Sequence, residues 1–181
     1  IPYFREDEPL EMPKLAKALE EVKQSSVLNG REDVEIVLEL GRYIVGHSGM
    51  FITKVLDVKE SKGEHFIITD GGINAFHRPK LMNLNHPSFV MEKVGQDCTI
   101  NASINGPLCT PIDRIAVPDD LPTVDVGDHV VFLNAGAYGY SLSILFFLSQ
   151  QTPVEVLVHE GKAHLVRSAR SLELFLQEEI S

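Results

Sequence analysis

Residues 105–143 begin with NGPLCTPIDRI and end with VGDHVVFLNAGAYGYSLS, and a polar connector rich in Pro and Asp joins the two parts. The run at 129–133 predicts a strand. Cys109 and Tyr138 stand in loops just outside apolar runs, where binding and catalytic residues concentrate. The stretch therefore predicts a β-rich region whose loops carry Cys109 and Tyr138 into a functional site.

Short strand signals also dominate the rest of the chain after residue 46. MFITKVLDV (50–58) and HFIITDGG (65–72) predict two strands joined by a turn, and a further strand signal lies at 97–104. The runs at 154–158 and 163–166 predict a hairpin, and 171–178 predicts a closing helix. Residues 47–181 are thus expected to be mainly β.

Residues 1–46 have a different pattern. The apolar spacing over 12–23, with Pro13 in the first turn, predicts an amphipathic helix. The β-branched run that ends at Glu39 predicts a buried parallel strand. Helix followed by strand is typical of the last unit of an α/β barrel.

Composition excludes several classes of function. The 181 residues have a net charge of −10, with 26 acidic against 16 basic side chains, so nucleic acid is not an expected partner. No run reaches the roughly 18 apolar residues of a membrane span. Two cysteines, Cys98 and Cys109, indicate a reducing, cytoplasmic setting, although a disulfide between them stays open. The start IPYFREDEPL lacks Met and any targeting pattern, which predicts a fragment or a processed chain.

Glu39, Gly41 and Arg42 follow the predicted parallel strand at its carboxyl end, where α/β folds bind ligands. A carboxylate, a glycine N–H and a guanidinium together suit a ligand with a cationic ring or amine and an anionic group. The alternative is a loop ion pair between Glu39 and Arg42. Arg78, next to Pro79, could bind a carboxylate through two parallel hydrogen bonds or lie free on the surface.

Cys109 lies in a rigid Pro-containing loop, an unusual place for a residue that is normally buried, although a buried thiol remains the alternative. Cys98, inside a strand signal, is predicted to be such a buried thiol. Tyr138 can offer its phenol to a phosphate or be a plain turn tyrosine. Asp70, Gly71 and Gly72 predict a tight turn. The histidines show no metal-ligand spacing, so no metal site is expected, and nucleotide-loop and serine-hydrolase motifs are missing from the sequence.

Six blocks occur in one order along the chain: ELGRYIV (39–45), FIITDGG (66–72), RPKL (78–81), GPLCTPID (106–113), LPTVDVGDHVVF (121–132) and AGAYGYSLS (135–143). Together they resemble the carboxyl part of the fold-type III pyridoxal-phosphate decarboxylases, the diaminopimelate and ornithine decarboxylase family. The resemblance implies that residues 1–46 end a TIM-type barrel and that 47–181 form a β-barrel domain like that of alanine racemase.

The resemblance also implies that part of the active site comes from other regions of the protein and from a second subunit. The lysine that binds the cofactor is in the family's amino-terminal part, so this chain alone is expected to be inactive. A homodimer with shared active sites would complete the enzyme.

The resemblance also assigns roles to the candidate residues. Glu39 matches the carboxylate beside the pyridine nitrogen of pyridoxal phosphate. Gly41, Arg42 and Tyr138 match residues around the cofactor, with the Gly41 N–H and the Tyr138 hydroxyl on its phosphate. Arg42 and Arg78 match positions that hold substrate carboxylates.

Cys109 matches a cysteine, contributed across the dimer interface, that protonates Cα after carbon dioxide leaves. Three departures bear on the substrate: Thr110 stands where diaminopimelate decarboxylases carry Glu, Met82 where a tyrosine is expected, and Phe146–Phe147 where Phe-Asn is usual. These weigh against meso-diaminopimelate, and GPLCTP (106–111) with the run FFL (146–148) more closely resembles the branch that decarboxylates a glutamyl-like amino acid on an acyl-carrier protein. Free meso-diaminopimelate as substrate, an amino-acid racemase of the same fold type, and a non-catalytic β-barrel binding module are the alternatives.

Overall fold

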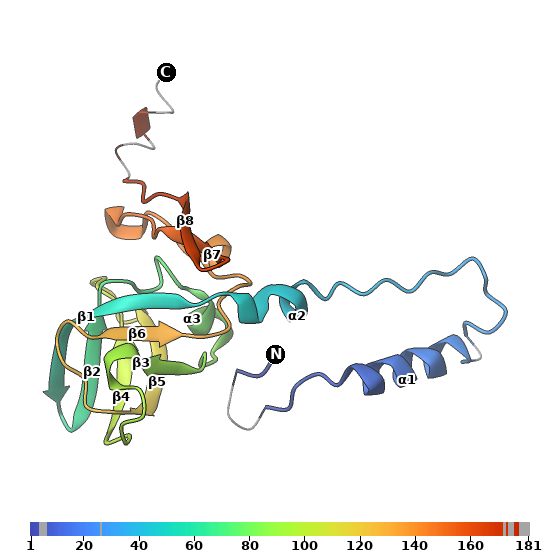
Figure 1. The fold of residues 1–181 in the computed structure, drawn as a ribbon, viewed down its shortest axis with the longest axis horizontal. Helices are drawn as coiled ribbons and strands as arrows, with labels where there is room; N and C mark the ends of the chain where they lie inside the picture. The colour runs from blue at the N-terminus through green and yellow to red at the C-terminus, as the bar shows by residue number, and fades with distance from the viewer. Residues whose placement is uncertain (4–6, 26, 172, 174–175, 178–181) are drawn as a thin grey trace.

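The structure is a computed structural model that describes residues 1–3, 7–25, 27–171, 173 and 176–177 (Figure 1). Three α-helices and four short 3-10 helices lie among these residues: α1 (Met12–Lys23), α2 (Gly41–Val45), η1 (Gly46–Ser48), α3 (Arg78–Met82), η2 (Met91–Lys93), η3 (Tyr140–Leu142) and η4 (Phe147–Ser149). The strands of the described residues are β1 (Phe51–Ser61), β2 (Glu64–Thr69), β3 (Ser88–Val90), β4 (Ile100–Asn105), β5 (Arg114–Leu121), β6 (His129–Phe132), β7 (Glu155–His159) and β8 (Lys162–Arg167).

Six of these strands form one sheet in the order β3-β6-β1-β2-β4-β5. β2 and β4 run parallel, and the other neighbours run antiparallel. A parallel pair needs a long crossover, which here comprises residues 70–99 and carries α3 and β3. The sheet curls around its core and stays open between β3 and β5, so the prediction of a mainly β, barrel-like domain is confirmed as a curled half-barrel.

The turn between β1 and β2 follows directly from its sequence. Lys62 and Gly63 both have positive φ, 55° and 80°, as a tight two-residue hairpin requires. Ser61 then pairs with Glu64 at the start of the ladder. The predicted two-strand unit is confirmed.

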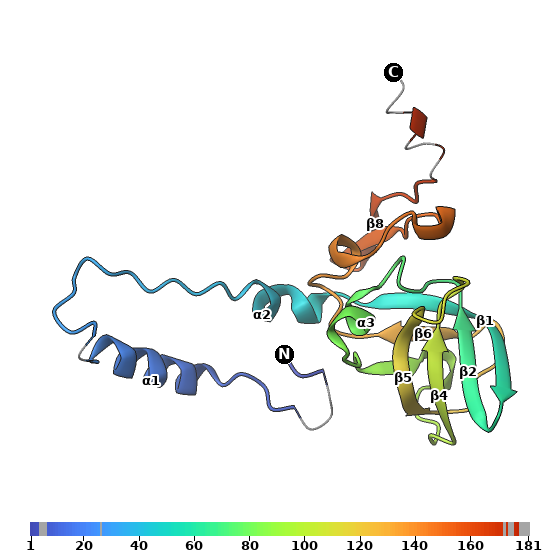
Figure 2. The same cartoon turned by 180° about the vertical axis from the view of Figure 1, so that it is seen from behind.

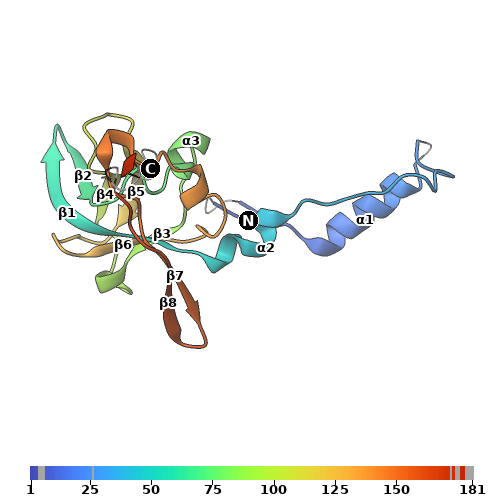
Figure 3. The same ribbon diagram turned by 90° about the horizontal axis from the view of Figure 1, so that it is seen from above.

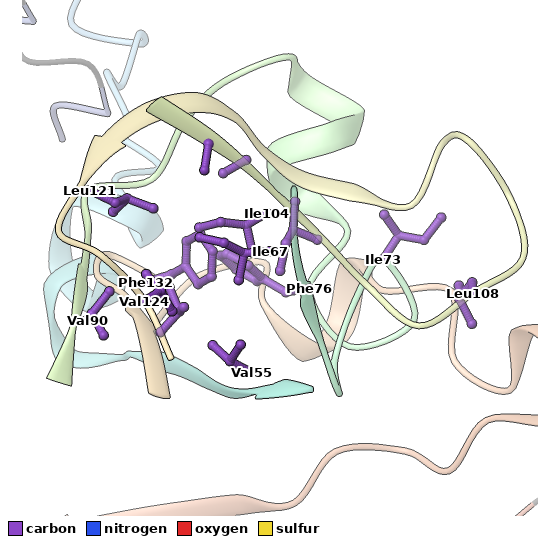
Figure 4. Close-up of a cluster of buried hydrophobic side chains, with 14 residues drawn as sticks. Val55, Ile67, Ile73, Phe76, Val90, Ile104, Leu108, Leu121, Val124 and Phe132 are labelled. Carbon is purple, nitrogen blue, oxygen red and sulfur yellow. The ribbon is translucent and has the colours of Figure 1, made fainter. Parts of the chain in front are cut away.

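The inner face of the sheet holds a core of apolar side chains (Figure 4). Phe132 of β6 is fully buried. Its ring centroid lies 5.8 Å from that of Phe76 and 6.0 Å from that of Phe51, which stacks on Phe76 at 5.0 Å. Phe76 comes from the crossover, so the crossover closes over the sheet and packs against it.

Residues 7–25 and 27–40, called the arm below, extend to one side of the sheet (Figures 1 and 2). The helix predicted over 12–23 is confirmed by α1, although none of its residues is buried. The predicted strand ending at Glu39 is wrong, because residues 32–40 have no ladder partner and Val37 is 69% exposed. An extended segment becomes a strand only beside another strand, and none of the described strands lies next to this one.

The hairpin β7–β8 projects from the sheet domain (Figure 3). Its turn uses Glu160 and Gly161, both with positive φ, so the prediction of a hairpin is confirmed. Its apolar side chains stay exposed on both faces; among them Val158 is 70% and Leu165 64% exposed. The closing helix predicted over 171–178 falls partly on residues 172, 174–175 and 178, which lie outside the described ones.

Two expectations need correction. Part of the polar connector predicted between Ile115 and Val126 is the strand β5, an edge strand of the sheet, where a sequence that contains Pro and Asp is compatible with strand structure. Cys98, predicted to be buried, precedes β4 and is exposed, as is Cys109, and both thiols are free. The open disulfide alternative is therefore not realised.

Candidate active site

Arg78, the first residue of α3, is the centre of the candidate site. It is 5% exposed, and its guanidinium carbon lies 5.3 Å from the ring centroid of Tyr3 and 5.1 Å from that of Tyr138. Stacking on aromatic faces stabilises a desolvated cation. The buried Nε of Arg78 has no hydrogen-bond partner among the described residues, so the guanidinium has a donor to offer a ligand.

Tyr3 connects the two arginines of the site. Its ring is 6% exposed and also lies below the guanidinium of Arg42, at 5.4 Å. Arg42, Arg78 and Tyr138, which are far apart in sequence, thus gather around one aromatic ring. The sequence prediction missed Tyr3; its place in the apolar run IPYF, directly before the charged run REDE, was the available signal.

Asn134 connects both the N-terminal residues and the segment after α2 to the sheet domain. Its Nδ2 donates to the Pro2 carbonyl at 3.1 Å, and its Oδ1 lies 2.7 Å from His47 Nδ1. Beside it, the Gly136 N–H donates to the Gly46 carbonyl at 3.0 Å. The N-terminal residues and the base of the arm are therefore held against the loop that carries Tyr138.

Tyr138 has a φ of 60°, which is unusual for a residue with a side chain and costs of order 1–3 kcal/mol. Its side chain is half exposed and borders a groove of about 930 Å³, which runs between the start of β1, the loop 138–141 and the hairpin strand β7. The phenol therefore lies where a ligand in the groove can contact it.

His86 lies behind Tyr3 and is 1% exposed. The two ring centroids are 4.6 Å apart, and His86 Nδ1 lies 2.8 Å from the Leu133 carbonyl, to which it donates. Burial lowers the pKa of His86 to about 4; the Leu133 hydrogen bond opposes this shift and the Arg78 charge adds to it. His86 is neutral at pH 7 and places no second positive charge beside Arg78.

Cys109 and Thr110 lie on a different loop, between β4 and β5. Cys109 is exposed, contrary to the buried-thiol alternative. The contacts of this loop are with the turn at Gly72 and Ile73, the turn predicted after β2. The structure records no contact between Cys109 and Arg78 or Tyr138 within the described part of one chain.

Glu39 lies at the end of the arm, and Gly41 lies next to Arg42. Glu39 is exposed, and Gly41 is the first residue of α2. The ion pair between Glu39 and Arg42 that the sequence left open is not among those formed by the described residues. Both groups are thus available to a ligand bound beside Arg42.

The donor set suits an anionic cofactor. Two guanidiniums and a phenol can bind phosphate and carboxylate oxygens, and the unpartnered Nε of buried Arg78 favours such a group. Among the described residues no group of three or more His, Cys, Asp or Glu could hold a metal ion, and no helix is long and apolar enough to cross a membrane.

Residues 42–136 match the protein family described as "Pyridoxal-dependent decarboxylase, C-terminal sheet domain". The chain belongs to this family. The L-glutamyl-[BtrI acyl-carrier protein] decarboxylase of Niallia circulans is 34% identical over 92% of this chain and 41% of its own length. The diaminopimelate decarboxylase of Aquifex aeolicus is 32% identical over 97% of this chain and 39% of its own length.

The fold has the same relatives. The crystal structure of Helicobacter pylori diaminopimelate decarboxylase complexed with L-lysine matches with a TM-score of 0.81 at 28% identity, over 99% of this chain and 42% of that one. This chain therefore spans about two fifths of the length of the pyridoxal-dependent decarboxylases it matches. The resemblance stated from the six sequence blocks is confirmed.

Proposed function

We propose that the whole protein is a pyridoxal-phosphate-dependent carboxy-lyase. Its substrate in this proposal is a glutamyl-like α-amino acid held on an acyl-carrier protein, and its site is shared by two copies in a homodimer. The observation that carries the proposal is the gathering of Arg42, Arg78 and Tyr138 around Tyr3, in a chain that belongs to a decarboxylase family. Residues 1–46 would end the cofactor-binding TIM-type barrel.

Each site residue has a task in this chemistry. When bound, pyridoxal phosphate takes up the electron pair that departing carbon dioxide leaves behind. The Glu39 carboxylate would keep the proton on the pyridine nitrogen by its opposite charge. The Gly41 N–H and the Tyr138 hydroxyl would donate to the phosphate, with Arg42 beside them. Arg42 and Arg78 would orient the substrate carboxylates.

Cys109 is assigned the proton transfer to Cα in the partner copy's site. A proton donor must come within hydrogen-bond reach of the carbon it protonates, so it has to stand at the surface if it acts across an interface. The exposed position of Cys109 on the β4–β5 loop meets this requirement.

The choice of a carrier-bound substrate rests on Thr110. Its hydroxyl lies 3.5 Å from the Ile112 amide and carries no charge to pair with a distal ammonium. A thioester-bound glutamyl group has no such ammonium. The groove of about 930 Å³ at Tyr138 is a path for the long flexible arm of a carrier protein.

A second candidate substrate is free meso-diaminopimelate. Diaminopimelate decarboxylases are among the relatives at 32–33% identity, and Helicobacter pylori diaminopimelate decarboxylase was crystallised with L-lysine. Thr110 and Met82, which is 53% exposed at the end of α3, are the positions that weigh against it.

The test is carbon dioxide release by the purified whole protein supplied with pyridoxal phosphate. Release from the glutamyl thioester and little from free meso-diaminopimelate is expected. Thr110→Glu should raise kcat/KM for meso-diaminopimelate about tenfold or more, since a hydrogen bond to a charged group is worth roughly 1.5–3 kcal/mol. Thr110→Gln is the matched uncharged control. A protein that neither shows the visible absorbance of lysine-bound cofactor nor releases carbon dioxide would refute the proposal.

A further inference from the structure

A buried carboxylate joins the Cys109 loop to a turn about forty residues away in sequence. Asp113 is 3% exposed. Its Oδ1 accepts the Ile73 N–H at 2.7 Å, and its Oδ2 accepts the Leu108 N–H at 2.8 Å. Hydrogen bonds to an ionised acceptor are about twice as strong as neutral ones, and leaving such a buried group unpaired is costly.

Two glycines make room for this carboxylate. A Cβ at Gly72 or at Gly106 would lie against the Asp113 carboxylate oxygens, closer than van der Waals contact allows. The main-chain carbonyl of Asp113 also accepts the Gly106 N–H at 3.0 Å. Three backbone N–H groups from two segments therefore converge on one residue, here called the Asp113 clamp.

The clamp fixes the residue next to Cys109. Leu108 is 8% exposed, and it lies with Ile73 at the same end of the core cluster (Figure 4). Within the loop, the Thr110 N–H donates to the Leu108 carbonyl at 2.8 Å and the Asp113 N–H donates to the Thr110 carbonyl at 3.1 Å. The peptide that carries the exposed thiol is thus held at both ends.

The same turn leads to the other part of the site. Ile73 is five residues before Arg78, and its carbonyl accepts the Ile144 N–H at 3.4 Å from the segment that follows Tyr138. One carboxylate therefore sets the Cys109 loop relative to the crossover that carries Arg78.

We propose that Asp113 is a positioning residue: it holds the thiol of Cys109 and the hydroxyl of Thr110 where they serve the partner copy's site. This inference rests on the proposed function for its kinetic consequence but not for the clamp itself. A displacement of about 1 Å in a reacting group can cost 100-fold in rate, so the clamp affects turnover rather than cofactor binding.

The first test uses the unaltered whole protein. The Ile73 and Leu108 amides are expected to exchange with deuterium as slowly as those of β4, although both lie in loops. Rapid exchange of both, as fast as at exposed Cys109, would overturn the clamp. No variant has to fold for this result.

The second test is Asp113→Asn, in which an amide nitrogen replaces one acceptor and faces a backbone donor. kcat is expected to fall about 10- to 100-fold with KM within about threefold. Asp57→Asn is the matched control, because Asp57 is exposed on β1 and, among the described residues, accepts only the N–H of the adjacent Val58.

Thiol alkylation by iodoacetamide separates positioning from general loss of structure. Asp113→Asn is expected to change the alkylation rate of Cys109 severalfold and to leave that of Cys98 unchanged. An Asp113→Asn enzyme with wild-type kcat and a wild-type Cys109 rate would end the inference and leave the proposed function standing. A wild-type protein that releases no carbon dioxide would end the proposed function, while exchange and alkylation would still decide the clamp.

Discussion

Replacing His86 by asparagine tests the electrostatics of the site through stability. His86 has an ordinary pKa of 6.5 and a folded-state pKa of about 4, chiefly because it is buried. Between these values the unfolded chain binds more protons than the folded one. The stabilisation is therefore complete above pH 6.5 and is lost as the pH falls toward 4.

The magnitude follows from the two pKa values. At pH 5 the unfolded imidazole is mostly protonated and the folded one is not, which makes the unfolding free energy about 2 kcal/mol smaller than at pH 7. The asparagine side chain of the variant cannot titrate, and its Nδ2 can still donate to the Leu133 carbonyl in place of the imidazole Nδ1. The variant is expected to be less stable at pH 7 but to lack this part of the pH dependence.

The assay is urea unfolding of both proteins at pH 7 and pH 5, followed by circular dichroism. Carboxylates titrate equally in the two proteins, so the difference between the two pH dependences reports His86 alone. Equal losses of stability by wild type and His86→Asn between pH 7 and pH 5 would refute the reasoning.

Three further predictions concern the core, the phenol and the arm. Phe132→Ala should lower the unfolding free energy by about 3–5 kcal/mol, because the ring is fully buried in β6; a small change in thermal midpoint would contradict this. Tyr138→Phe keeps the ring under Arg78 but removes the hydroxyl, so cofactor affinity, measured by spectral titration, should fall about tenfold; an unchanged affinity would exclude the phosphate role. Gly136→Ala places a methyl group against the Val45 carbonyl, so residues 46–49 should detach and proteolysis near the base of the arm should quicken; wild-type cleavage rates would count against it.

Local chemistry made much of this fold predictable. The β1–β2 and β7–β8 hairpins follow from glycine-containing turns, and α1 follows from its apolar spacing and Pro13. The strand predicted before Glu39 failed because ladder pairing depends on a neighbour that local sequence does not show. β5 was not predicted, because an edge strand can contain the Pro and Asp residues that usually indicate a loop.

The sequence prediction of the candidate site was incomplete, although three of its residues do gather in the structure. Arg42, Arg78 and Tyr138 were chosen from sequence and lie together, whereas their connecting residues were missed. Tyr3 and His86 are in contact although more than eighty residues separate them in sequence, and Asp113 accepts hydrogen bonds from backbone N–H groups. Contacts of these two kinds leave no pattern in the local sequence. Long-range contacts of this kind emerge only once the chain has folded.

The late position of β6 in the chain also bears on how the domain forms during synthesis. β6 lies between β3 and β1 and joins strands that begin 41 and 78 residues before it, counted from Ser88 and Phe51 to His129. Until β6 has been synthesised, one edge of β1 has no neighbouring strand and β3 has no strand to pair with. The six-stranded sheet can therefore be completed only after residue 132 has been made, a topology that favours slow, late folding and a need for protection of exposed strand edges on the way.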